Sequence, residues 1–207
     1  MALLTHLDVV NAACARIGAE PIEDFDDDLG GGQAASLVYE EIVRFNLGIY
    51  RFSWATTIRP LSMLTNATPF TGWDYVYELP AERLGPPLYI TDDITCPDAR
   101  FSRYTLVGST VHSDAEALFA AIKFLPDPHL WSATFLSATV TALASDLSYA
   151  LANDRQGKET LYREAYGAPS EMFRGGKMGA AIREDGQATP PRKPDYDNNP
   201  LTRAWLS

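Results

Sequence analysis

Three histidines are the residues of this chain best suited to acid-base or metal chemistry, and their spacing favours neither. His6 begins an expected helix, His112 ends an expected strand, and His129 stands at the start of another helix. None of them is at metal-ligand spacing from another histidine or from a cysteine. We therefore expect the histidines to be structural or exposed, and we expect no metal and no cofactor.

An acidic run between residues 20 and 28 is the next candidate, for calcium. Asp24, Asp26 and Asp28 alternate as in the start of an EF-hand loop. However, the sixth position is Leu29 where the loop needs glycine, and the twelfth is Ala35 where it needs a bidentate glutamate. A solvated acidic loop is the better interpretation.

Motifs for phosphate binding and nucleophilic catalysis are incomplete. The glycines 30–32 are not followed by Lys-Ser/Thr, and 157–159 ends in glutamate, so neither is a P-loop; no G-x-S-x-G elbow occurs. Asp114 and Glu116 form an acidic pair of the kind that glycoside hydrolysis uses, but such pairs are common by chance. The sequence predicts no enzyme, and a peptidoglycan hydrolase would require this or another acidic pair to line a cleft.

Composition describes an ordinary globular chain with an acidic surface. Its 207 residues carry a formal net charge of -10, and 46% of them are hydrophobic, enough to bury a full core. An acidic balance disfavours a surface that grips nucleic acid through phosphate neutralisation, although DNA could still pass beside it. Cys14 and Cys96 form no CxxC pair. Neither an export signal nor a membrane span is expected.

Periodicity predicts helices at both ends of the chain and strands between them. Thr5 and Asp8 suit a capping box, and Gly18 is placed to end the first helix. Alternation in 75–79 indicates a strand, and 108–109 suits a two-residue turn. The Ala-rich segment 117–125 could be helix or strand, and we favour strand. The expected fold is α+β, mainly α: a helical bundle with helices 6–17, 33–50, 128–152 and 157–173, and a small antiparallel β-rich insert over 54–125.

The helix expected over 128–152 carries a narrow apolar stripe. Asp127 suits its N-cap and Pro128 its first helical position. Leucine and valine recur at spacings of three and four, with alanine, serine and threonine between them. The stripe fits either a core helix of a monomer or a contact between copies. We predict a contact between copies, made by Leu136, Val140, Leu143 and Leu147.

Beyond the domain expected over residues 1–173, the composition changes. Residues 174–207 are rich in glycine and proline and poor in apolar residues, so they cannot build a core of their own. The segment nevertheless ends in an apolar and cationic set: Leu201, Arg203, Trp205 and Leu206. It fits either a disordered tail or an extended C-terminal arm that becomes ordered on a partner. We predict the arm.

Several sequence features follow one another in a defined order along nearly the whole chain. The first is VNAACARIGAEP at 10–21, followed by an acidic loop and YRFSWA at 50–55. The others are TIRPL at 57–61, GWDYVYELP at 72–80, the segment 104–113, and KFLPDPHLW at 123–131 before the Ala/Leu-rich helix. In their order and spacing, more than in any single feature, they resemble the head-to-tail adaptor family of phages, called the tail tubular protein A family in short-tailed phages.

The resemblance implies a noncatalytic virion protein of the head-tail interface, assembled in the host cytoplasm. Such adaptors form a ring, twelve-fold in the family, below the portal protein, and they present a platform to a tail nozzle or stopper. DNA passes through the ring without specific binding, and no membrane is involved. The family pattern implies that the helices form the ring wall, that the sheet region faces the tail and that the terminal arm reaches the portal. The alternatives are a tail-associated peptidoglycan hydrolase and a monomeric protein-binding module.

Overall fold

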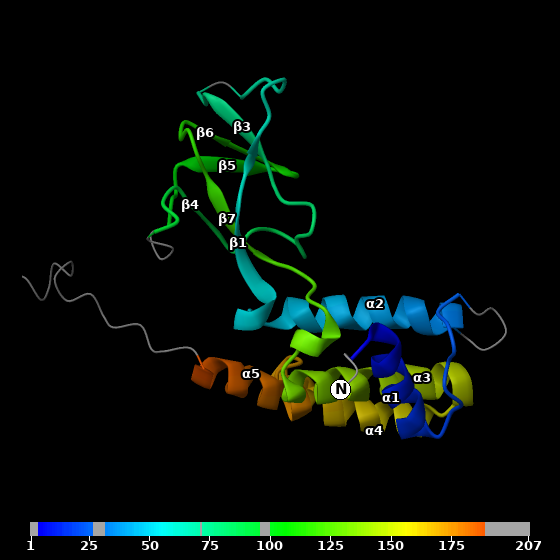
Figure 1. Ribbon diagram of the computed structural model, residues 1–207. Helices are drawn as coiled ribbons and strands as arrows, with labels where there is room; N and C mark the ends of the chain where they lie inside the picture. The colour runs from blue at the N-terminus through cyan, green and yellow to red at the C-terminus, as the bar shows by residue number, and fades with distance from the viewer. Residues whose placement is uncertain (1–3, 27–31, 71, 96–99, 189–207) are drawn as a thin grey trace, which may run out of the picture.

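The computed structural model describes residues 4–26, 32–70, 72–95 and 100–188. Over these ranges the chain is a mixed α+β protein, as predicted, with helices at both ends and antiparallel strands between them. In Figure 1 the strands gather on one side of α2, and the other helices lie on its opposite side. The helices are α1 (His6–Ile17), α2 (Gly32–Ile49), α3 (Ala133–Ala152), α4 (Arg155–Tyr166) and α5 (Gly176–Ala188).

Helix α1 begins and ends where the sequence predicts. The Thr5 side chain accepts from the backbone N–H of Asp8, and the Asp8 carboxylate accepts from the Thr5 N–H, which completes the capping box. This bonding lowers the pKa of Asp8. At the other end Gly18 adopts φ 72°, a left-handed conformation that glycine takes without steric cost.

We call helices α1 to α5 the helical lobe. Helix α3 is its central helix, and α1, α2, α4 and α5 all pack on it. Ten of its twenty residues are buried, and most of these are alanine, serine or threonine. Small side chains on several sides of one helix allow neighbouring backbones to approach it closely. Among the described residues α3 is also the one helix long and apolar enough to cross a membrane, but core helices pass the same test, and α3 is used as one here.

A buried polar network joins three of these helices. Asn46 of α2 is fully buried; its side-chain amide donates to Thr139 Oγ1 of α3 at 3.1 Å and accepts from the Tyr166 hydroxyl of α4 at 2.7 Å. Because each polar atom has a partner, the network fixes how the helices are placed without the cost of an unpaired buried group. Burial also raises the pKa of Tyr166.

Ion pairs connect α4 to the helices on either side. Glu164 accepts from Arg16 of α1 at 2.5 Å and from Lys177 of α5 at 2.9 Å. The hydrogen bond from Lys177 is the main cause of the lowered pKa of Glu164, with Arg16 contributing. The three side chains are partly exposed, so we expect the pairs to contribute modestly to stability.

The strands form two small antiparallel sheets with orders β1-β7-β4 and β2-β3-β6-β5. They share a second hydrophobic core that includes Tyr77, Ile90, Val111 and Ile122. Gly108, with φ 58°, lies in the turn between β5 and β6, as predicted. The segment 117–125 contains a strand, which confirms that prediction. The strands are β1 (Thr56–Pro60), β2 (Ser62–Met63), β3 (Tyr75–Glu78), β4 (Tyr89–Thr91), β5 (Tyr104–Val107), β6 (Thr110–Ser113) and β7 (Phe119–Lys123).

Two contacts fix the sheet region to the helices. At the end of β7, Lys123 Nζ donates to the carbonyl oxygens of Leu47 and Gly48 at the C-terminus of α2, where a cation also opposes the helix dipole. Burial lowers the pKa of Lys123. Asp185 of α5 accepts from the backbone N–H of Ser53 at 3.0 Å and from its hydroxyl at 2.6 Å, at the start of the 3-10 turn η1 (Ser53–Ala55).

Two predicted helices have different bounds in the structure. The helix expected over 128–152 is interrupted: Pro128 begins a 3-10 turn, η2 (Pro128–Leu130), Asp127 makes no side-chain cap bond, and α3 is capped by Ser132. The helix expected over 157–173 starts earlier and ends at Tyr166, since Gly167 and the turn η3 (Pro169–Glu171) follow. An irregular segment that contains η3 thus stands where the sequence predicts the last two turns of this helix.

The beginning of the predicted C-terminal arm is also different. Residues 176–188 form helix α5, with Met178 and Ala181 buried against the helical lobe and Asp185 bonded to Ser53. An extended arm starting at 174 is therefore wrong for this part of the chain. This segment is helical because these three buried residues, at helical spacing, pack against the rest of the protein and offset the low helix propensity of its glycines.

Candidate interaction surface

The histidines are placed as structural residues. His6 Nδ1 lies 2.5 Å from the Tyr39 hydroxyl, and His112 stacks on Phe70 with ring centroids 4.4 Å apart while its Nδ1 accepts from the Phe70 N–H. His129 is exposed in η2. Within the ranges that the structure describes, no three His, Cys, Asp or Glu residues come together as a metal would need.

The predicted contact residues of α3 fall into two groups. Leu143 and Leu147 are 0% exposed and lie in the chain's own core, which corrects the expectation that they contact another copy. Leu136 and Val140 are half-buried and pack against the same core. The stripe is therefore mainly intramolecular, because the four surrounding helices cover it. The predicted arm residues Leu201, Arg203, Trp205 and Leu206 lie outside the described residues.

A different part of the helical lobe exposes large apolar side chains. We call it the aromatic groove, and it consists of Phe45 on α2, Tyr149 on α3, Tyr162 on α4, and Met172 and Phe173 in the turn before α5. Each is between 39% and 76% exposed. Isolated exposed apolar residues are ordinary, but a contiguous set of this kind is typical of an interaction surface.

Ring contacts hold the centre of the aromatic groove together. The Phe173 ring lies edge-on to Phe45, with centroids 5.2 Å apart, and to Tyr166, at 5.8 Å. Tyr162 contacts Tyr166 in the same way at 5.1 Å. Edge-to-face contacts fix ring orientation. The exposed edges of Phe45, Tyr162 and Phe173 are thus presented by a rigid base, since Tyr166 is buried and hydrogen-bonded to Asn46.

The backbone of the turn is strained where it presents the groove. Met172 and Phe173 have φ of 49° and 64°, a left-handed conformation that is uncommon outside glycine, asparagine and aspartate. The turn is held by the Gly175 N–H, which donates to the Tyr166 carbonyl, and by the Glu171 carboxylate, which accepts from the Ala168 N–H. Met172 is nevertheless 76% exposed, so its own side chain does little to offset the strain.

We expect Met172→Gly to stabilise the isolated chain. Glycine adopts this φ without steric cost, and little apolar contact is lost with an exposed side chain; the gain is partly cancelled by the greater freedom of glycine in the unfolded chain. The free energy of unfolding is expected to rise by about 0.5 kcal/mol, as measured by urea denaturation. Met172→Ala is the matched control, because it removes the same side chain and keeps the strain. A glycine variant less stable than the alanine variant would contradict the claim of strain.

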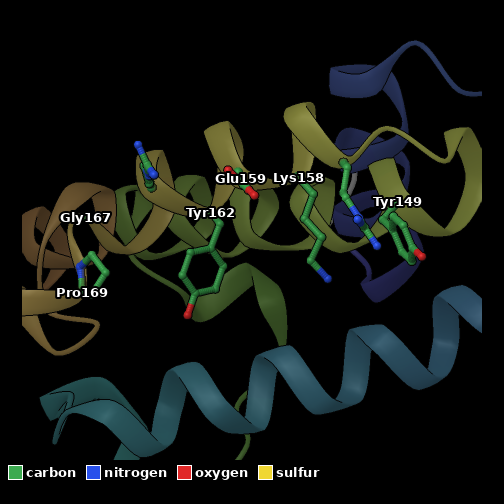
Figure 2. Close-up of a pocket in the computed structure, with 8 residues that line it drawn as sticks. Tyr149, Lys158, Glu159, Tyr162, Gly167 and Pro169 are labelled. Carbon is green, nitrogen blue, oxygen red and sulfur yellow. The ribbon is translucent and has the colours of Figure 1, made fainter.

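Two hollows flank the strained turn. One, of about 670 Å³, is lined by residues of α4 together with Tyr149, Gly167 and Pro169. Figure 2 shows Tyr162 and Lys158 pointing from α4 toward α2 on this side of the lobe. The other, of about 550 Å³, lies between the end of α2 and residues 170–174. Both are open to the surface, so together they extend the aromatic groove to either side of Phe173.

Cations border the first hollow. Lys158 pairs with Asp146 at 2.6 Å, and its ammonium lies 5.6 Å from the centre of the Tyr149 ring. Arg155 and Arg163 also line the hollow, and neither takes part in an ion pair among the described residues. Burial, and then the charge of Asp146, raise the pKa of Tyr162. Glu159 is the one acidic residue in the lining, against three basic ones. The groove is therefore apolar at its centre and carries net positive charge along α4.

Sequence reasoning missed this surface because periodicity does not distinguish a covered face from an open one. Phe45 falls on the apolar side of the helix expected over 33–50, and Phe173 is among the apolar residues of the helix expected over 157–173. In the structure both are exposed by more than two fifths. α4 ends before Phe173, and Phe45 is covered only in part by the rings of Tyr166 and Phe173. The run of Met-Phe between Pro169 and Gly175 is a signal that could have suggested an apolar turn.

Comparison with known proteins adds no family. No family model matches this chain, and no curated protein matches it.

Proposed function

We propose that this chain is a head-to-tail connector adaptor of a phage, a structural virion protein that forms a homo-oligomeric ring below the portal. In this proposal the helical bundle, with its inserted sheet region, forms the ring, and DNA passes through it during ejection. The observation that carries the proposal is the aromatic groove: a rigid, exposed apolar surface on a strained turn, suited to binding protein. The adaptor-like sequence features, through their order along the chain, support the more specific assignment to the head-to-tail adaptors.

The partners proposed are further copies of the chain, twelve in all by the family pattern, the portal on one side and a tail nozzle or stopper on the other. A net charge of -10 suits a conduit along which DNA slides, because like charges keep the duplex from adhering. The portal contact is assigned to the C-terminal arm, now restricted to residues after α5. Leu201, Arg203, Trp205 and Leu206 remain its proposed anchors, as aromatic and arginine side chains often dominate binding energy.

Co-sedimentation with portal rings of the phage that encodes this chain tests the proposal. We expect the full chain to sediment with the rings and a chain lacking 190–207 to remain in the supernatant. Trp205→Ala is expected to weaken attachment by about 2 kcal/mol, a value typical of a buried aromatic anchor. The deletion is expected to leave thermal unfolding unchanged, because α5 and its contacts with the helical lobe are kept.

Two results would contradict the proposal. Undiminished sedimentation of the shortened chain would remove the docking role of the arm, and a large fall in melting temperature would show that the arm packs on its own body. A full chain that stays monomeric with or without portal rings would favour the binding-module alternative. Turnover of peptidoglycan by the purified chain would favour the hydrolase.

A further inference from the structure

We infer that the aromatic groove binds a second copy of this chain through that copy's acidic segment, which we define as residues 20–26. The inference rests on the proposed function and names the surfaces that meet in the ring. In this contact Arg155 and Arg163, which border the groove, bind carboxylates of the acidic segment of the neighbouring copy.

The first hollow of the groove differs in charge from the rest of the protein. The first hollow is lined by three basic side chains, Arg155, Lys158 and Arg163, and by one carboxylate, Glu159. On a chain whose net charge is -10, this makes the hollow a local region of net positive charge. Lys158 is already paired with Asp146, whereas the two arginines have no ion-pair partner among the described residues. A planar guanidinium binds carboxylate in a bidentate way. An acidic protein segment is therefore the partner that the groove fits.

The acidic segment of the same chain has the complementary character. It contains Glu20, Glu23, Asp24 and Asp26, all exposed, and no lysine or arginine occurs between Arg16 and Arg44. None of its carboxylates takes part in an ion pair within the described ranges.

The acidic segment is also held in shape. Asn11 receives the Ile22 N–H at 2.7 Å and donates to the Ile22 carbonyl at 3.0 Å, and Phe25 packs on Tyr39. Little conformational entropy is then lost when the segment binds. Glu23 follows Ile22, and Asp24 and Asp26 flank Phe25. Because Ile22 and Phe25 are held in place, these carboxylates form an acidic surface before the partner binds.

Two different surfaces of one chain produce a head-to-tail contact. A contact of this kind either closes into a ring or continues as a filament, which is the geometry that an adaptor ring needs. The apolar centre of the groove supplies area, because burying Phe45, Phe173 and Met172 removes exposed apolar surface from water. The charged pairs select the partner and its register.

A charge-swap experiment tests the inference. One variant reverses the groove, with Arg155→Glu and Arg163→Glu, and the other reverses the acidic segment, with Glu23→Lys and Asp24→Lys. Sedimentation velocity is measured for each variant alone and for an equimolar mixture, with and without portal rings. The control for the reversed groove, Arg100→Glu with Arg183→Glu, makes the same change in net charge as that variant at exposed positions outside the groove. All the substituted positions are exposed, and melting temperatures check that each variant is folded.

We expect each reversed variant to need about a tenfold higher concentration to assemble, since like charges then face each other. The mixture is expected to assemble as the unaltered chain does, because each groove meets an acidic segment of opposite charge in an alternating ring. The control is expected to assemble normally. Reversed variants that assemble normally, or a mixture that fails to recover, would overturn the inference while leaving the proposed ring intact. A chain that never assembles, even with portal rings, would overturn the proposed function as well.

Discussion

Leu143→Asp is expected to unfold the isolated chain. Leu143 is 0% exposed at the middle of α3, the helix on which all the other helices pack. A carboxylate there would lose its hydration without gaining a partner, and the leucine contacts would be lost too. We expect the free energy of unfolding to fall by about 4 kcal/mol or more, a large part of the stability of an ordinary domain. Urea denaturation, or recovery in the insoluble fraction, measures the effect.

Leu151→Asp is the matched control for this prediction. It places the same charge on the same helix, but Leu151 is 41% exposed in the last turn of α3. We expect a change of no more than about 1 kcal/mol, as for other surface substitutions. If Leu143→Asp remained folded and lost only its assembly with other copies, the leucine would belong to an interface, as the sequence alone led us to predict.

The case of α3 shows what periodicity can and cannot predict. The pattern correctly indicates a long helix with a covered stripe. It does not say whether other helices of the same chain or another copy cover it, because both bury leucine in the same way. Alanine, serine and threonine on the remaining sides were the better signal, since a helix surrounded by four others needs small residues all round.

Local signals were the most reliable. The capping box at Thr5, the ending at Gly18 and the turn at Gly108 depend on a few neighbouring atoms, and the structure confirms all of them. Alternating polarity also predicted the strand at Tyr75–Glu78. These features depend on residues close together in the sequence and not on distant contacts, which explains why they can be predicted from the sequence.

Features that depend on tertiary contacts were missed. Helix α5 contains three glycines, Gly176, Gly179 and Gly186, and its composition resembles that of a linker. It is helical because Met178 and Ala181 pack into the lobe and because Lys177 pairs with Glu164. The aromatic groove was missed for a similar reason, because its residues come from helices far apart in the sequence and its central turn is held by contacts with Tyr166.

Phe135 is the buried residue that the leucine stripe concealed. It is 0% exposed at the start of α3, next to the half-buried Leu136. Three aromatic rings surround it, Phe52 at 5.0 Å, Trp54 at 4.9 Å and Trp131 at 5.2 Å between centroids. Since Phe52 and Trp54 lead directly into β1, this cluster joins the helical lobe to the sheet region.

Phe135→Ala is therefore expected to lower the free energy of unfolding by about 3 to 5 kcal/mol, the usual cost of removing a fully buried aromatic ring and leaving a cavity. Phe52 and Trp54 pack against each other with ring centroids 5.3 Å apart, and Trp131 Nε1 donates to the Pro126 carbonyl, so the neighbouring rings cannot close the space easily. Leu136→Ala is the matched control; it removes a half-buried side chain one position away, and we expect it to cost clearly less. Urea denaturation followed by tryptophan fluorescence measures both, since Trp54 and Trp131 contact the Phe135 ring. Equal losses for the two variants would mean that the aromatic cluster does not hold the two lobes together.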